Sequence, residues 1–112
     1  MTMISKLMLC LLAAAALGAS AAQASDMESA KAKVTAVCAA CHGMDGNSQL
    51  PDYPKLSGQH RDYLAKALRD YKTGVRKNPI MAGMAGPLTQ QDIENLADYF
   101  GSQPAKVATP HH

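Results

Sequence analysis

The pentapeptide Cys38-Ala39-Ala40-Cys41-His42 constrains this chain more than any other feature of its 112 residues. Two thiols and an imidazole stand within five residues, so any fold of the chain must place all three together. Cysteine motifs of this spacing occur in disulfides, in redox-active dithiols, in zinc sites and in sites of covalent cofactor attachment. The rest of the sequence decides among these four interpretations.

Three of the four interpretations fit the sequence poorly. A disulfide between cysteines three positions apart closes a very small loop and therefore stabilises little. A thioredoxin-like dithiol needs a βαβ frame, and the chain shows no strand pattern. A structural zinc site needs four ligands, and the other histidines, His60, His111 and His112, do not stand at finger-like spacing.

Covalent attachment of one haem c explains the motif best. On one helical turn, thiols at i and i+3 can meet the two vinyl groups on one edge of a porphyrin, and the next residue places an imidazole under the iron. The sequence therefore predicts thioether bonds from Cys38 and Cys41, with His42 as an iron ligand.

The first 24 residues have the pattern of a secretory signal peptide. Lys6 is followed by an apolar run over 7–17 and by small residues ending in an A-x-A site at 22–24, which predicts cleavage before Ser25. The run is too short for a good membrane span, which needs about 20 apolar residues. We therefore expect a periplasmic protein with no stable membrane insertion after the signal is cleaved.

Removal of a 24-residue signal leaves 88 residues, enough for one small domain over 25–103 and a disordered tail over 104–112. A domain of this size is marginally stable unless something staples it. With one Phe, four Tyr and no Trp, its own side chains supply little bulky core. A large, flat, apolar cofactor would fill that gap.

The apolar periodicity predicts an all-α fold. Its three main helices are expected over 26–41, 60–73 and 89–100. Gly74 is placed to end the second helix, and residues 89–92 resemble a capping box that starts the third. The segments 42–59 and 75–88 are rich in glycine and proline and are predicted to be long loops.

The order of these features resembles the class I c-type cytochromes. A first helix, C-x-x-C-H, Pro-Lys-Leu-x-Gly-Gln, a middle helix, a methionine-bearing loop and a last helix ending in Tyr-Phe follow one another over 30–103. More narrowly, the chain is similar to small periplasmic cytochromes of the c-553 type and to single halves of the dihaem c-four type. The resemblance implies the class I cytochrome c fold, with three main helices and two long loops around one haem.

The resemblance also implies roles for individual residues. Cys38 and Cys41 correspond to the thioether cysteines and His42 to the proximal iron ligand. Pro54 corresponds to the proline whose backbone carbonyl accepts a hydrogen bond from the second ring nitrogen of that histidine. The residues at positions where the family packs the haem, or where core packing alone would explain them, are Leu56, Leu68, Ile80 and Leu96.

Met81 corresponds to the distal iron ligand, because the family pattern is Met-x-Gly and its first methionine binds iron. Met84, three residues later, is then expected to serve packing. A thioether ligand favours ferrous iron and raises the reduction potential. Among the other candidate ligands, Met44 lies too close to His42 to reach the opposite face, and His60 is expected to be exposed.

Charge is unevenly distributed along the chain. Residues 55–77 carry seven Lys or Arg against two Asp, a net charge of +5, whereas residues 25–54 and 78–112 each carry a net charge of −2. The basic segment could steer an acidic redox partner, or it could be an ordinary solvated helix face. Nucleic acid is excluded as a partner, because an exported protein with a formal charge of +2 lacks the basic surface that it needs.

The expected function is single-electron transfer between a redox donor and an acceptor, with the protein acting as a monomer. Iron with two protein ligands has no open site for substrate, which argues against an enzyme. Two alternatives remain open. One is the haem c subunit of a larger dehydrogenase or sulfur-oxidising enzyme; the other is a sensor or peroxidase-like protein whose methionine dissociates.

Overall fold

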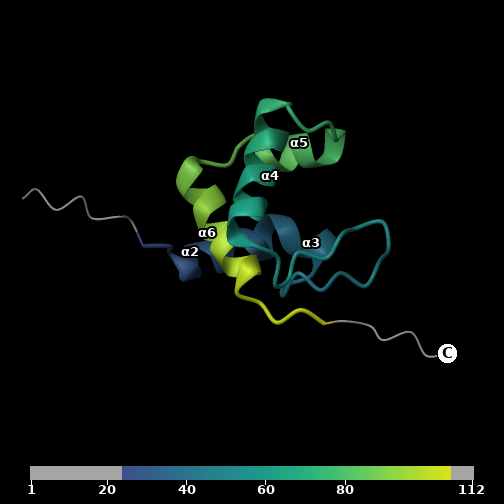
Figure 1. The fold of residues 1–112 in the computed structure, drawn as a ribbon, viewed down its shortest axis with the longest axis vertical. Helices are drawn as coiled ribbons and strands as arrows, with labels where there is room; N and C mark the ends of the chain where they lie inside the picture. The colour runs from purple at the N-terminus through teal and green to yellow at the C-terminus, as the bar shows by residue number, and fades with distance from the viewer. Residues whose placement is uncertain (1–23, 107–112) are drawn as a thin grey trace, which may run out of the picture.

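The computed structural model describes residues 24–106, and within this range the chain contains helices and turns but no strand. The helical elements in chain order are α2 (Met27–Lys33), η1 (Val34–Cys38), α3 (Ala39–His42), α4 (Arg61–Thr73), α5 (Pro79–Ala85) and α6 (Gln90–Gly101) (Figure 1). η1 is a π-helical turn that joins α2 to α3. The predicted all-α fold is therefore confirmed.

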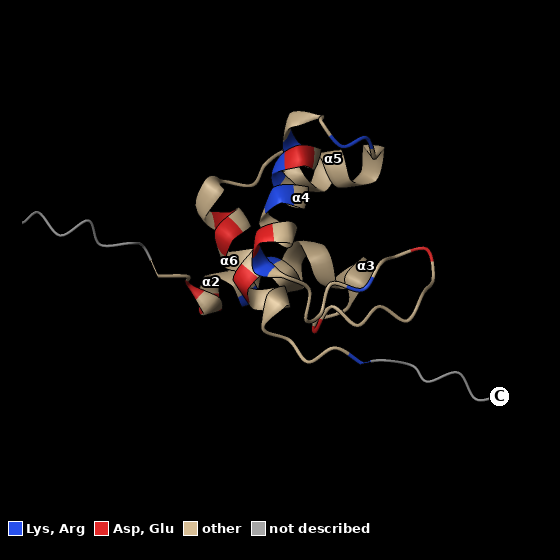
Figure 2. Ribbon diagram, in the orientation of Figure 1, with Lys and Arg blue, Asp and Glu red and all other residues tan. Residues whose placement is uncertain are grey.

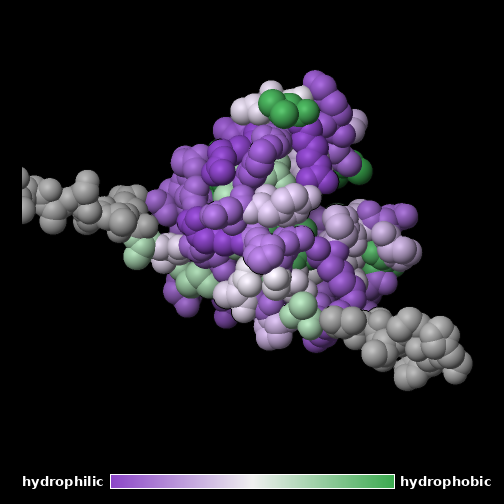
Figure 3. Space-filling model, viewed as in Figure 1, coloured by the Kyte–Doolittle hydropathy of each residue, from purple (hydrophilic) through white to green (hydrophobic). Residues whose placement is uncertain are grey.

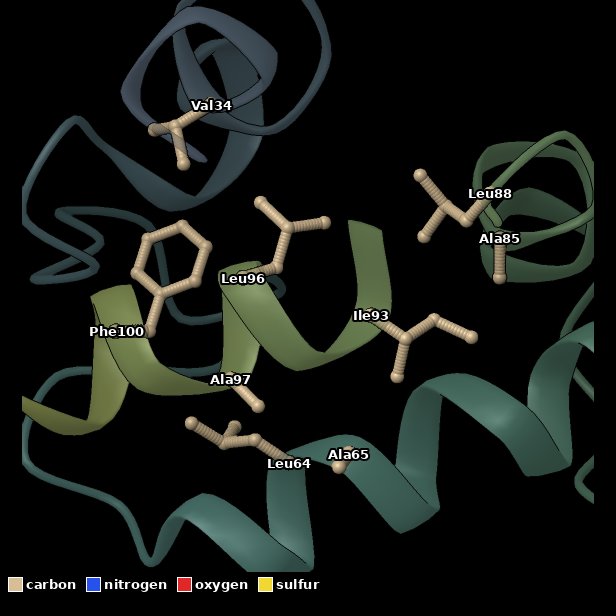
Figure 4. Close-up of a cluster of buried hydrophobic side chains, with 9 residues drawn as sticks. All are labelled: Val34, Leu64, Ala65, Ala85, Leu88, Ile93, Leu96, Ala97 and Phe100. Atoms are coloured by element: carbon tan, nitrogen blue, oxygen red, sulfur yellow. The ribbon is translucent and has the colours of Figure 1, made fainter. Parts of the chain in front are cut away.

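The core forms around α6, because α2 and α4 both pack against it while α5 packs on α4. Figure 4 shows the α6 side chains between α4 and Val34 of the first helix. The hydrophobic core of the described chain is a cluster of nine buried side chains: Val34, Leu64, Ala65, Ala85, Leu88, Ile93, Leu96, Ala97 and Phe100. Three of them are alanines, so the side chains fill only a small volume, as the composition predicted.

The sequence periodicity predicted one continuous α-helix over 26–41. In the structure this helix is interrupted by the π turn η1. An inserted residue rotates every later side chain by about 100° relative to an unbroken α-helix. At the end of this turn, the side chains that pack against the core are those of Cys38 and Ala39. The helical stretch contains no glycine or proline that would have marked this turn in the sequence.

The ends of the two longer helices are as predicted. Gly74 ends α4 in the left-handed conformation, with φ of 82°. At the start of α6, the Thr89 side chain accepts a hydrogen bond from the Asp92 backbone N–H, and the Asp92 carboxylate accepts one from the Thr89 N–H. This reciprocal capping box satisfies two donors that the first turn of the helix would otherwise leave unpaired.

The second predicted loop, 75–88, is the main correction, because its centre is the helix α5. Asn78 is extended, as the following proline requires. That geometry, however, suits an N-cap: the Asn78 side chain accepts hydrogen bonds from the backbone N–H groups of Ile80 and Met81, both at 3.0 Å. Pro79 is favourable in the first turn, where its missing N–H costs nothing. Gly83 lies inside this helix rather than in a turn.

Apart from His42, which ends α3, the first predicted loop contains no helix. The expected disordered tail, in contrast, needs correction at its start. Pro104 and Lys106 hydrogen-bond to Asn47 through their backbone groups, so the ordered chain continues past residue 103. The rest of the tail, 107–112, and nearly all of the predicted signal peptide lie outside the described residues. Within 24–106, no helix combines the length and apolar character needed to cross a membrane.

The capping of α5 is testable by substitution at Asn78. Asn78→Ala removes the acceptor of two backbone hydrogen bonds and should lower the free energy of unfolding by about 1 kcal/mol. Asn78→Asp keeps an equally good capping oxygen and should cost much less. Denaturant unfolding of the haem-loaded protein measures both. Equal stability of Asn78→Ala and the parent would show that the segment is not a capped helix.

Candidate functional site

The two cysteines lie one turn apart at the end of the first helix. Both thiols are half-buried and neither forms a disulfide. Burial raises the pKa of the Cys38 thiol, and the nearby positive charge of Lys33 offsets this only in part. Burial thus disfavours the thiolate form of Cys38. The disulfide interpretation finds no support in this geometry.

His42 is the last residue of α3, and its side chain is buried, with 8% of its surface exposed. Its Nδ1–H donates to the backbone carbonyl of Pro54 at 2.8 Å, the contact that the family resemblance implied. The Tyr53 ring stands edge-on at 6.5 Å between centroids. No hydrogen bond to Nε2 comes from the part of the chain that the structure describes. The ring nitrogen Nδ1 is thus anchored to the loop, and the other ring nitrogen, Nε2, is available to a metal.

The loop that carries Pro54 is closed at a narrow neck around Gly46. The Gly46 carbonyl accepts hydrogen bonds from Leu56 N–H at 2.8 Å and Ser57 N–H at 3.3 Å. Gly46 has φ of 72°, and a Cβ there would lie 2.8 Å from Phe100 Cδ1 and 2.9 Å from Ser57 N. Glycine is required on both grounds. The neck fixes Leu56, and so holds Pro54, two residues earlier, within reach of His42.

Met81 and Met84 both lie on α5, one turn apart, so they point to the same side of that helix. Met81 is half-buried, whereas Met84 is 45% exposed. In Figure 1, α5 lies on the same side of α4 as α3 and the first loop. Figure 3 shows the surface hollowed on that side, between the part formed by α5 and the part formed by the loop.

The predicted haem-packing residues differ in their surroundings. Leu96 is buried among the helices, while Leu56 and Leu68 are half-buried at the edge of the core. Ile80 is 61% exposed on α5, and Leu50 on the first loop is 57% exposed. Large aliphatic side chains are therefore left uncovered on the two segments that flank the hollow.

The other candidate ligands have different roles. Met44 is exposed, and its sulfur accepts a hydrogen bond from the Thr35 hydroxyl at 3.7 Å. His60 is exposed at the N-cap of α4, as expected. Within residues 24–106, no three His, Cys, Asp or Glu side chains gather as a metal site, so the zinc interpretation finds no support. His111 and His112 lie outside the described residues.

These observations fit haem c. A buried imidazole with one anchored and one free nitrogen, two unpaired thiols one turn away and uncovered aliphatic side chains are what an apolar, covalently held iron porphyrin needs. The sequence did not predict the contact of Tyr53 or the neck at Gly46. The Asp45-Gly46 pair, a common turn sequence, was an available signal for the neck.

Comparison with known proteins gives the same result. The family model "Cytochrome c" matches residues 27–103. Cytochrome c4 of Thiocapsa roseopersicina is 48% identical over 86 residues, which cover 77% of this chain and 44% of the relative. The crystal structure of reduced recombinant cytochrome c4 from Pseudomonas stutzeri superimposes with a TM-score of 0.68 at 46% identity, covering 75% of this chain and 48% of that one. This chain thus spans about half the length of cytochrome c4.

A shorter match shows where else the domain occurs. The cytochrome subunit of sulfide dehydrogenase from Chlorobaculum tepidum is 40% identical over 65 residues, 58% of each chain. The family model covers most of the chain, a solved cytochrome c4 shares its fold, and the chain itself carries the C-x-x-C-H spacing at the site described above. The chain therefore belongs to the cytochrome c family and binds haem c covalently.

Proposed function

We propose that this protein is a single-electron carrier of the periplasm and not an enzyme. The observation that carries the proposal is His42, whose Nδ1 is anchored to Pro54 while Nε2 is free, directly after the two thiols in a chain of the cytochrome c family. Bound haem supplies an iron that alternates between ferrous and ferric. Cys38 and Cys41 hold it by thioethers, and His42 and Met81 bind the iron.

The Pro54 contact prepares His42 for this role. A carbonyl that accepts the Nδ1 proton fixes the tautomer, sets the ring orientation and makes Nε2 a stronger electron donor. Tyr53 limits rotation of the ring from one side. Little reorganisation is then needed when the charge on the metal changes, which favours fast electron transfer.

The Met81 assignment supports transfer rather than catalysis. With His42 and Met81 both bound to the iron, no position would remain for a substrate, and a thioether ligand would raise the reduction potential. Met81 is less exposed than Met84, and the Asn78 cap holds its backbone in the first turn of α5. Both observations favour Met81 as the ligand.

The basic segment 55–77 has fewer unpaired charges than its sequence suggests, because three of its seven cations form ion pairs with carboxylates. Arg61 pairs with Glu94 and Asp98 of α6, Arg69 also pairs with Glu94, and Lys66 pairs with Asp70. The other four have no carboxylate partner within the described residues, and three of them, Lys72, Arg76 and Lys77, surround the end of α4 (Figure 2).

We place the docking of an acidic redox partner at this end of α4. Arg76 stacks on the Tyr71 ring at 4.9 Å and donates to the Tyr63 hydroxyl, so its charge is held in one position. Val75 between these cations is 73% exposed. A fixed cation beside an uncovered aliphatic side chain suits a transient encounter, in which charge guides approach and the apolar contact excludes water.

The second candidate function is that of a haem c subunit docked permanently to a dehydrogenase. The match to a cytochrome subunit of sulfide dehydrogenase favours it. The two functions differ in their dependence on salt. A carrier meets its partner by diffusion, whereas electron transfer inside a permanent complex does not depend on an encounter.

The attachment proposal has a direct test. The mature protein should gain the mass of one haem, keep its colour through acid–acetone extraction and show one reversible one-electron couple. Cys38→Ser or Cys41→Ser should weaken or abolish accumulation of the haem-loaded protein. A colourless, folded protein with two free thiols would contradict the proposal.

The ligand assignment is tested by a pair of methionine substitutions. Met81→Ala should abolish the weak long-wavelength sulfur-to-ferric-iron band, lower the potential and open the iron to cyanide or carbon monoxide. Met84→Leu should keep the band and cost at most about 1.5 kcal/mol of stability, as a volume-conserving change. The reverse pattern would transfer the ligand role to Met84 without affecting the proposed electron transfer.

The docking proposal predicts a position-dependent effect of charge. Lys77→Glu should lower the association rate with an acidic redox partner several-fold at low ionic strength. Lys31→Glu, the same charge change on an exposed cation of α2, should have a smaller effect. The difference should vanish at high salt, because exposed charges are screened over about 8 Å at physiological ionic strength. A rate independent of salt and of protein concentration would favour the subunit function instead.

A further inference from the structure

The side chain of Asn47, with only 4% of its surface exposed, joins three segments that are far apart in the sequence. Its Oδ1 accepts hydrogen bonds from the Ser57 hydroxyl at 2.7 Å and from the Lys106 backbone N–H at 2.9 Å. Its Nδ2 donates to the Pro104 carbonyl at 3.0 Å. The amide thus ties both sides of the loop neck to the segment 104–106, which we call the strap.

The strap also lies directly against the loop. Gly58 has φ of 69°, and a Cβ there would lie 3.0 Å from the Cβ of Ala105. The Gly58 N–H donates to the Phe100 carbonyl at 3.0 Å, which connects the same point to the last turns of α6. The neck is therefore held from two directions, by α6 and by the strap.

The exposed contacts of the strap are weaker than the Asn47 bonds. Lys106 Nζ lies 3.4 Å from an Asp45 carboxylate oxygen, and Lys55 Nζ donates to the Lys106 carbonyl at 3.0 Å. Both pairs are exposed to solvent, where ion pairs and similar contacts contribute little. The buried amide, whose partners would be left without hydrogen bonds if it were removed, has the larger effect on the neck.

Pro54 lies inside the loop that this neck closes, three residues before Ser57. The acceptor of the His42 hydrogen bond is the backbone carbonyl of Pro54, so its position depends on the path of the loop backbone and not on a side-chain rotamer. The carbonyl stays 2.8 Å from Nδ1 only as long as both sides of the loop are held at the neck. Among residues 24–106, Asn47 is the one buried side chain whose hydrogen bonds connect the two sides of the loop and the strap.

We propose that Asn47 and the strap form a positioning clamp for His42: they hold the Pro54 carbonyl against Nδ1, and so control ring orientation and the reduction potential. This inference rests on the proposed role of His42 as an iron ligand. Among the described residues, no hydrogen bond of Asn47 goes to the imidazole or to a residue proposed to bind the haem, so we expect it to act through the loop.

Exchange of the His42 Nδ1 proton with water reports the clamp most directly. In the ferrous haem-loaded protein, NMR should show exchange at least tenfold faster for Asn47→Ala than for the parent. The midpoint potential should rise, because a histidine with a weaker hydrogen bond donates less electron density to ferric iron. Both readouts are independent of electron-transfer activity with a partner.

Asn95→Ala is the matched control for a general loss of stability. Asn95 is also a buried asparagine, 3% exposed, and it accepts hydrogen bonds from the Asp26 N–H and the Gln91 amide, away from the loop. Its substitution should leave Nδ1 exchange within twofold of the parent and the potential unchanged. Equal behaviour of Asn47→Ala and Asn95→Ala would overturn the clamp.

Two substitutions at Lys106 decide the matter even if Asn47→Ala does not accumulate. Lys106→Pro removes the backbone N–H that Asn47 accepts, whereas Lys106→Ala keeps it, and both remove the same exposed side chain. The clamp predicts fast Nδ1 exchange for proline and parental exchange for alanine; the same rate in both would refute it. A protein with these exchange rates but without a reversible one-electron couple would contradict the proposed function and leave the clamp intact.

Discussion

The hydrogen bond from His42 Nδ1 to the Pro54 carbonyl is the contact on which the arrangement of the site depends. It joins the end of the first helix to a loop that has no regular structure of its own. Without it, nothing else among the described contacts would choose between the two nitrogens of a buried imidazole. With it, Nδ1 is the donor and Nε2 carries no proton, so the protein itself decides the tautomer and leaves Nε2 for the proposed iron bond.

The buried core is small, so the contact between His42 and Pro54 depends on further hydrogen bonds at the loop neck. The buried cluster consists largely of alanine, leucine and isoleucine, and it is built around one helix, α6. Covalently held haem adds the large apolar surface that the side chains lack, which in a domain of this size contributes substantially to stability. Cofactor and fold therefore depend on each other: the helices place the thiols and the imidazole, and the porphyrin completes the core.

Pairing between helices also decides which charges remain available for recognition. Glu94 and Asp98 of α6 take up Arg61 and Arg69 of α4, and this pairing helps hold the two helices together. Of the four cations of residues 55–77 without a carboxylate partner in the described chain, Lys72, Arg76 and Lys77 lie at the other end of α4. A charge segment that is uniform in the sequence is thus divided into a structural part and a part that can meet a partner.

The sequence by itself determined the helix ends and the first half of the site. A helix end depends on the backbone of its own turn, so local sequence is sufficient to predict it. The examples are the capping box of Thr89 and Asp92 and the left-handed Gly74. The spacing of Cys38, Cys41 and His42 likewise lies within one helical turn. Only the tertiary structure decided the π turn that ends at Cys38, the ordered strap over 104–106 and the hydrogen bonds of Asn47. The helix α5 has a local start signal, the Asn78 cap before Pro79, but the glycines and prolines of this segment indicated a loop. The hydrogen bonds between Asn47 and the strap join residues distant in the chain, and distant contacts leave no periodic trace in a sequence.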